Sequence, residues 1–184
     1  SFMAPLNQIA DFALDQNRSA PSSVLRAVLI VMVLLAAFLL FQLEPLTGKI
    51  ITPRFGGTAG TWSVCLFFFQ MVVLAGYGLT WALTKLKERS QVLIYAALAL
   101  ASLYWQQIPA PAQWLNASGD PALEVMALLL KNIAVPGLFL ASISGTVQVW
   151  YARARFGDPY PLYAVSNVGS LTALLSYPLL VEPN

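Results

Sequence analysis

The side chains that could do chemistry in this chain are a few charges and amides set in long apolar stretches. Segment 44–61, which we expect to be a loop, holds one acid and two bases, Glu44, Lys49 and Arg54, among prolines and glycines. Glu44 paired with either base would make a small polar pocket, and the paired glycines in this segment permit a close approach of backbone. The other interpretation is a connector whose charges lie in a polar surface layer. The sequence leaves both open.

Four more polar side chains interrupt apolar stretches, and they are Gln70, Lys131, Gln148 and Asn167. Side chains of this kind are expected to face the interior of the bundle, where they either bind a polar solute or tie helices together by hydrogen bonds. We favour the structural role for the three amides. Lys131 is expected to extend its ammonium group to a polar boundary, and the alternative is a cation that faces a substrate or a partner.

Other kinds of chemistry are excluded by residue counts. The 184 residues include no histidine and one cysteine. No imidazole is available as a general base or as a zinc or haem ligand, and no internal disulfide or CxxC pair can form. The formal net charge of +2 does not suggest nucleic acid as a partner. We therefore predict a protein that is not an enzyme and holds no cofactor, least of all a histidine-ligated one.

The composition indicates a membrane protein. Hydrophobic residues make up 58% of the chain and charged residues only 10%, whereas a soluble domain carries about 25% charged residues. A crossing helix needs about 20 mostly apolar residues. Five stretches qualify, approximately 24–43, 62–84, 91–108, 123–150 and 163–181. The predicted fold is an all-α, polytopic transmembrane bundle of about five spans over residues 24–184.

The basic residues predict how the spans are oriented. Seven of the ten bases would fall on one side of the membrane: Arg18, Arg26, Lys85, Lys87, Arg89, Arg153 and Arg155. Because cytoplasmic loops carry the excess of Lys and Arg, this pattern puts the N-terminus in the cytoplasm. We predict a multi-pass protein of the bacterial inner membrane. Residues 1–23 read as a short amphipathic segment whose polar face is acidic, so packing on protein is favoured over binding to anionic lipid.

Small residues recur at helical spacing in two of the predicted spans. Such faces let another helix approach closely. They serve helix packing within the bundle or the docking of another membrane subunit. The residues are Gly137, Ala141 and Gly145 in the fourth span, and Ser166, Gly169, Ser170 and Ala173 in the fifth.

Two ordered sets of residues carry a family resemblance. The first is Gly56-Gly57-Thr58, Trp62, Phe69-Gln70 and Gly76-Tyr77, and the second is Tyr163, Ser166-Asn167 and Gly169-Ser170. The chain resembles the membrane portion of spermidine-synthase-like integral membrane proteins, often labelled fused major-facilitator/spermidine-synthase proteins. The resemblance implies a helical membrane fold. In that family a Rossmann-like catalytic domain follows, but no Gly-rich strand-to-helix turn is present here, so the resemblance does not imply aminopropyl transfer.

Three functions follow as hypotheses. The leading one is a non-catalytic membrane subunit or anchor that lies in the lipid bilayer and packs against partner membrane proteins. The alternative is a transporter or channel-like module for a small polar or cationic, polyamine-like solute. The third is the membrane part of a spermidine-synthase-like enzyme whose catalytic domain is absent from this chain.

Overall fold

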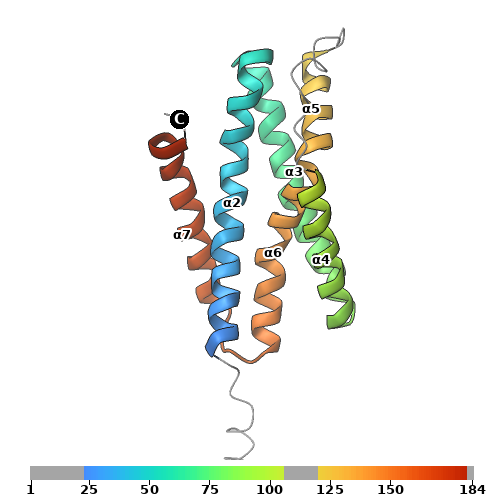
Figure 1. Ribbon diagram of the computed structural model, residues 1–184, viewed down its shortest axis with the longest axis vertical. Helices are drawn as coiled ribbons and strands as arrows, with labels where there is room; N and C mark the ends of the chain where they lie inside the picture. The colour runs from blue at the N-terminus through green and yellow to red at the C-terminus, as the bar shows by residue number, and fades with distance from the viewer. Residues whose placement is uncertain (1–22, 106–119, 182–184) are drawn as a thin grey trace, which may run out of the picture.

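The computed structural model describes residues 23–105 and 120–181, and every regular element in these ranges is a helix (Figure 1). The elements are α2 (Ser23–Phe55), α3 (Ala59–Leu83), α4 (Glu88–Trp105), α5 (Pro121–Asn132), α6 (Ala134–Arg153), α7 (Tyr160–Ser176) and a π-helical turn, η2 (Tyr177–Val181). The all-α prediction is confirmed for the described residues. The predicted amphipathic segment lies outside them apart from Ser23.

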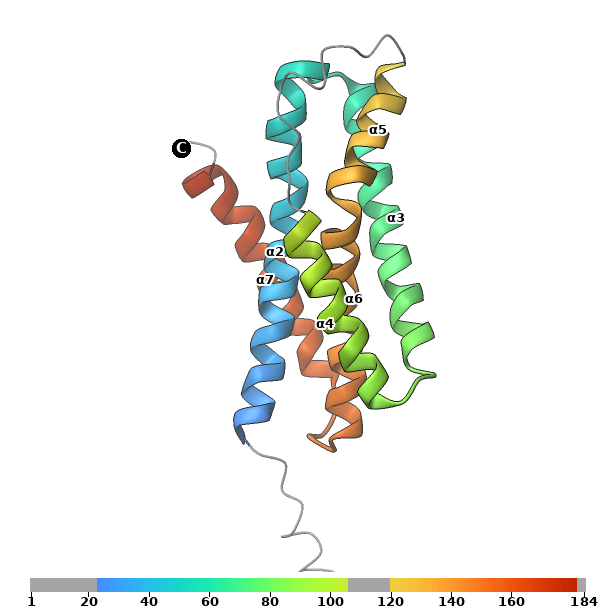
Figure 2. The ribbon, with the colours of Figure 1, turned by 45° about the vertical axis from the view of Figure 1, so that its right-hand side comes forward.

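Helix α6 lies at the centre of the bundle. It packs against α2, α3 and α4, while α7 lies on the far side of α2 and crosses it at an angle (Figure 2). The buried apolar side chains form two clusters along the bundle. One surrounds Val33 and Val147, and the other surrounds Phe68 and Leu129. The two clusters together join all six α-helices into one bundle.

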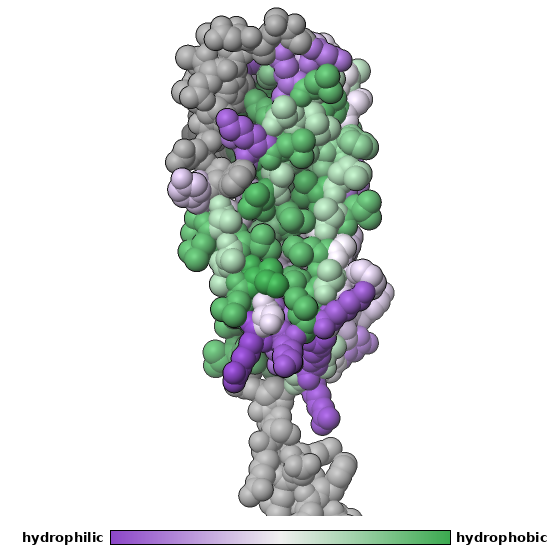
Figure 3. Space-filling model, turned by 90° about the vertical axis from the view of Figure 1, so that its right-hand side faces the viewer, coloured by the Kyte–Doolittle hydropathy of each residue, from purple (hydrophilic) through white to green (hydrophobic). Residues whose placement is uncertain are grey.

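Two helices are long and apolar enough to cross a membrane, α2 and α3, and the bent pair of α5 and α6 makes a third if it is one span. Large apolar side chains are also exposed, and a broad hydrophobic surface lies between hydrophilic residues at the two ends (Figure 3). A soluble protein rarely exposes so large an apolar surface. The described residues therefore support a membrane protein.

The expectation of a loop over 44–61 was wrong, because α2 continues to Phe55. Pro45 and Pro53 lie inside this helix. The Thr47 and Thr52 hydroxyls donate to carbonyl oxygens one turn back, at 2.6 Å and 2.7 Å, as threonines near helix prolines do in membrane proteins. The connection to α3 is only residues 56–58, with Gly56 at φ +76°.

The length of α2 explains where the charged residues near its C-terminal end lie. Its 33 residues extend about 50 Å, well beyond a hydrocarbon layer of about 30 Å. Lys49 and Arg54 are exposed in its last turns, which bend over one end of the bundle (Figure 2). These charges therefore fit the headgroup layer better than a pocket inside the bundle.

The fourth predicted span is broken into α5 and α6, which meet at 63°. Pro136 lies in the first turn of α6 and has no N–H for the carbonyl of Asn132, and its ring crowds that carbonyl. The buried Asn132 side chain donates back to the Leu128 carbonyl at 2.8 Å. Proline is thus the physical cause of the break. Lys131 is exposed in the last turn of α5. A cation there interacts favourably with the negative end of the helix dipole.

Candidate functional site

Small residues bring α3 and α6 into close contact. A Cβ placed on Gly76 would lie 2.7 Å from the Cβ of Ala141, and one on Gly137 would lie 3.1 Å from Val72. Gly145 lies against Thr80, and a Cβ on Gly145 would lie 3.1 Å from the Thr80 Cγ2. The predicted row of Gly137, Ala141 and Gly145 therefore packs on α3 of the same chain.

The second row of small residues packs α7 on α2. A Cβ on Gly169 would lie 2.5 Å from the carbonyl oxygen of Leu34 and 3.2 Å from the Cβ of Ala37. Ala173 is fully buried in the same seam. Ser170 donates to the carbonyl of Ser166 at 3.0 Å, within its own helix. Gly169 and Ala173 therefore pack α7 on α2 of this chain, and Ser170 bonds within its own helix.

A buried glutamine secures the far end of this seam. The Gln42 amide nitrogen donates to the Ala173 carbonyl at 2.9 Å and to the Ser176 hydroxyl at 2.7 Å. The Tyr177 hydroxyl donates to the carbonyl of Pro45 at 3.1 Å. Three hydrogen bonds thus fix the C-terminal end of α7 on α2.

Hydroxyl groups from three helices form a buried network in the middle of the bundle. The Tyr95 and Thr146 hydroxyls are 2.5 Å apart. The hydroxyl of Thr80 donates to the Ser142 carbonyl at 3.0 Å and lies 3.3 Å from that of Thr146. Sequence reasoning missed this network, since isolated Thr and Tyr residues in apolar helices give no signal of their partners.

The seven residues proposed for a polar pocket lie on five different helices. Glu44 and Gln148 are half-buried, on α2 and α6, and the Gln148 amide lies 3.5 Å from the hydroxyl of Ser144 on its own helix. The other five are exposed: Lys49 and Arg54 on α2, Gln70 on α3, Lys131 on α5 and Asn167 on α7. None of the seven side chains is buried, and a polar pocket formed by them stays a prediction.

Two of these residues present amides on the outer surface of the bundle. Gln70 lies close to the middle of the 25-residue helix α3, and Asn167 lies close to the middle of α7. Both side chains are exposed. Neither makes a hydrogen bond to any residue that the structure describes. Their type was identified from the sequence, but we expected them to face the interior.

A second glutamine joins α4 to α6 near the charged end of the bundle. Gln91 is almost fully buried. Its oxygen accepts from the Trp150 indole N–H at 2.7 Å, and its nitrogen donates to the Leu86 carbonyl at 2.9 Å. One amide thereby holds the start of α4 on the end of α6.

Replacing Gln91 with leucine is expected to destabilise the fold by about 2 kcal/mol, because the half-buried Trp150 indole N–H loses its acceptor and the Leu86 carbonyl loses a donor. Unfolding of the purified protein in mixed detergent micelles measures the loss. Gln148→Leu is the matched control, since it removes an amide whose hydrogen bond is long. Equal stability of the two variants would show that the Gln91 bonds do not hold the helices together.

The described ranges, 23–105 and 120–181, contain no cluster of three or more His, Cys, Asp or Glu side chains that could hold a metal ion. Comparison of the chain with protein-family models, curated proteins and solved structures found no match. The resemblance to spermidine-synthase-like membrane proteins remains a prediction. Functional inference consequently depends on the surfaces of the bundle itself.

Proposed function

We propose that the chain is a non-catalytic integral membrane subunit that binds a partner membrane protein through exposed faces of α3 and α7. The observation that carries the proposal is the exposed Gln70 amide in the middle of an apolar helix. A polar group that faces hydrocarbon without a hydrogen bond is unfavourable by several kcal/mol. A helix of a partner protein would supply the missing donor and acceptor.

The surface around Gln70 supports close contact with another helix. Leu74 and Gly78 follow at intervals of four residues, so they lie on the same side of α3. Leu74 is 62% exposed, and a Cβ on Gly78 would meet no atom within 4 Å. A small residue one or two turns from a polar one is typical of contacts between membrane helices.

Helix α7 offers a second such face. It packs on α2 by one side, and on the other it exposes Asn167, Val168 and Leu171. Asn167 presents two donors and one acceptor oxygen. Two amide-bearing faces on different helices favour a partner, or two partners, over an isolated chain in lipid.

The topology we propose has five spans and a cytoplasmic N-terminus in the bacterial inner membrane. The bases agree with it, because the Arg153 guanidinium donates to the Thr84 carbonyl at 3.1 Å. This contact puts the basic end of α6 beside the turn that follows α3, which carries Lys85 and Lys87. Positive charge gathered at one end of the bundle is what the cytoplasmic face requires.

Purification of the tagged chain from its own membranes in a mild detergent is the test. We expect a second membrane protein to co-purify at a fixed ratio, and liposomes that contain the pure chain to show no uptake of labelled spermidine. The buried hydroxyls of Tyr95, Thr80 and Thr146 support the second expectation, since they already bond to one another and to the Ser142 carbonyl. A chain that purifies without a partner and takes up labelled spermidine into liposomes would contradict the proposal and favour a transporter.

A further inference from the structure

We propose that a groove between α2, α4 and α6 binds one anionic phospholipid, with an acyl chain in the groove and the phosphate beside Arg153. The proposal depends on the chain lying in a membrane, but not on a partner protein. Its two parts are an apolar cavity and a charged cavity that adjoin along α6.

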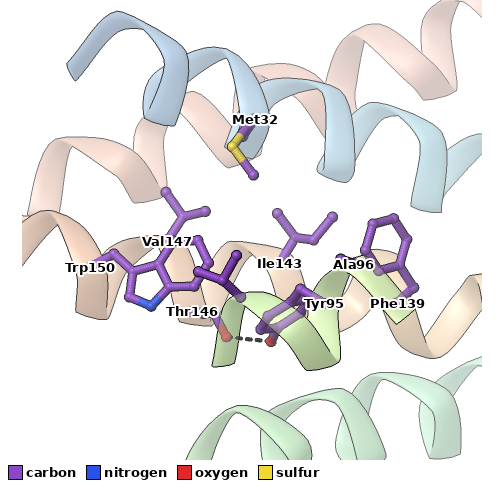
Figure 4. Close-up of a pocket in the computed structure, with 9 residues that line it drawn as sticks. Met32, Tyr95, Ala96, Phe139, Ile143, Thr146, Val147 and Trp150 are labelled. Atoms are coloured by element: carbon purple, nitrogen blue, oxygen red, sulfur yellow. Dashed lines mark hydrogen bonds between the residues drawn. The ribbon is translucent and has the colours of Figure 1, made fainter. Parts of the chain in front are cut away.

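The apolar part has a volume of about 320 Å³, at the lower end of the usual range for ligand sites, about 300–1,000 Å³. Figure 4 shows Met32 of α2 on one side, Tyr95 and Ala96 of α4 on another, and α6 side chains from Phe139 to Trp150 along the length. The twelve residues from Phe139 to Trp150 span about 16 Å along the helix axis. A long, narrow ligand fits this shape.

The polar atoms of the wall already have partners. The hydroxyls of Tyr95 and Thr146 bond to each other (Figure 4). The Trp150 indole N–H donates to Gln91. A sugar, a polyamine or a peptide would need hydrogen bonds that this wall does not offer. A hydrocarbon chain needs none, so the groove selects an acyl chain.

A second cavity of about 330 Å³ continues the groove toward the charged end of the bundle. It shares Val92 and Trp150 with the first cavity and adds Glu88, Arg153 and Ala154. The Arg153 guanidinium donates once to the Thr84 carbonyl. Since guanidinium has five N–H groups and matches phosphate geometry, the others remain for a phosphate oxygen.

The charge around this mouth favours an anion. Lys85, Lys87 and Arg89 are exposed on the turn and helix start beside it, and hydrophilic residues gather at this end of the molecule (Figure 3). The N-terminus of α4 adds the positive end of a helix dipole. Glu88 opposes this, as the acidic residue of the lining. The sum of the charges is positive, so the matching headgroup is anionic.

Native mass spectrometry of the purified chain, given equal amounts of phosphatidylglycerol and phosphatidylcholine with identical acyl chains, tests the site. We expect one phosphatidylglycerol per chain, bound about tenfold more tightly than phosphatidylcholine. Both lipids carry the phosphate, but only phosphatidylcholine also brings a trimethylammonium group, which the bases of this mouth repel. Arg153→Gln is expected to abolish this preference and Arg153→Lys to keep part of it. Glu88→Gln is expected to increase it.

Matched variants separate the two parts of the site. Arg155→Gln removes a base at the same helix end that does not line the cavity, so it should leave the preference unchanged. Ala96→Phe fills the groove and should weaken the binding of both lipids. Ala97→Phe, on the adjacent face of α4 outside the lining, should leave the binding of both lipids unchanged. An equal affinity for the two lipids, or binding that Ala96→Phe leaves intact, would overturn the proposal. Loss of a protein partner in Ala96→Phe with unchanged lipid binding would also overturn it, because a protein segment would then be the occupant.

Discussion

Gly169→Ala is expected to destabilise the bundle by about 2–3 kcal/mol, at the upper end of the range for overpacking. The added methyl group would lie 2.5 Å from the Leu34 carbonyl oxygen and 3.3 Å from the Phe38 nitrogen. Both neighbours are backbone atoms and cannot rotate away. Helix α7 must therefore move off α2, which stretches the Gln42 hydrogen bonds at the end of the seam. Unfolding in mixed detergent micelles measures the change.

Gly78→Ala is the control for this prediction. It makes the same chemical change inside a helix, but a methyl group there meets no atom within 4 Å. Alanine also has a better helix propensity than glycine, by up to about 1 kcal/mol, so we expect equal or greater stability. If the two variants lost the same stability, close packing at Gly169 would not be the reason.

Gln70→Leu is expected to reduce retention of the partner protein about tenfold while the fold of the chain itself is unchanged. Leucine keeps the size and apolar contact of the side chain but removes the amide, and one or two hydrogen bonds between membrane helices are worth up to about 1.7 kcal/mol. Because Gln70 is exposed and bonds to no described residue, its loss leaves no unpaired group within the chain. The ratio of the two proteins after purification is the measurement.

Two further variants interpret that result. Asn167→Leu is expected to weaken partner retention in the same way if α7 also contributes to the interface. Gln148→Leu removes an amide that is half-buried on α6, so partner retention should stay at the level of the unmodified chain. Equal losses from Gln70→Leu and Gln148→Leu would point to a general effect of removing polarity and not to an interface on α3.

Sequence patterns predicted the helices best where breakers and charges lie together. The breaker expected at 85–90 coincides with the turn 84–87 and the start of α4, and Gly157-Asp158-Pro159 separates α6 from α7, as expected. The prediction failed at 44–55, where α2 continues through two prolines and three charged residues to Phe55. It was incomplete at 123–150, where Pro136 bends the chain by 63°. A proline can end, bend or extend a helix, and its neighbours in space decide which.

The candidate surfaces were harder to predict than the helices. Residue type identified Gln70 and Asn167 as unusual, but the side of the helix that they occupy depends on which faces pack. The contact of Gly169 with Leu34 and the hydroxyl pair of Tyr95 and Thr146 join residues far apart in the chain. Neither hydrophobic periodicity nor sequence spacing predicts such pairs, because they depend on how the helices pack.

Photocrosslinking in native membranes tests the proposed interface most directly. A photoreactive phenylalanine analogue is placed at position 70, at position 167 and, as a lipid-facing control, at Leu93, which is 70% exposed on α4. We expect irradiation to join positions 70 and 167 to a distinct membrane protein, with position 93 giving no such product. Absence of a protein adduct at position 70, or the same adduct at all three positions, would contradict the assignment of this chain as a partner-binding membrane subunit.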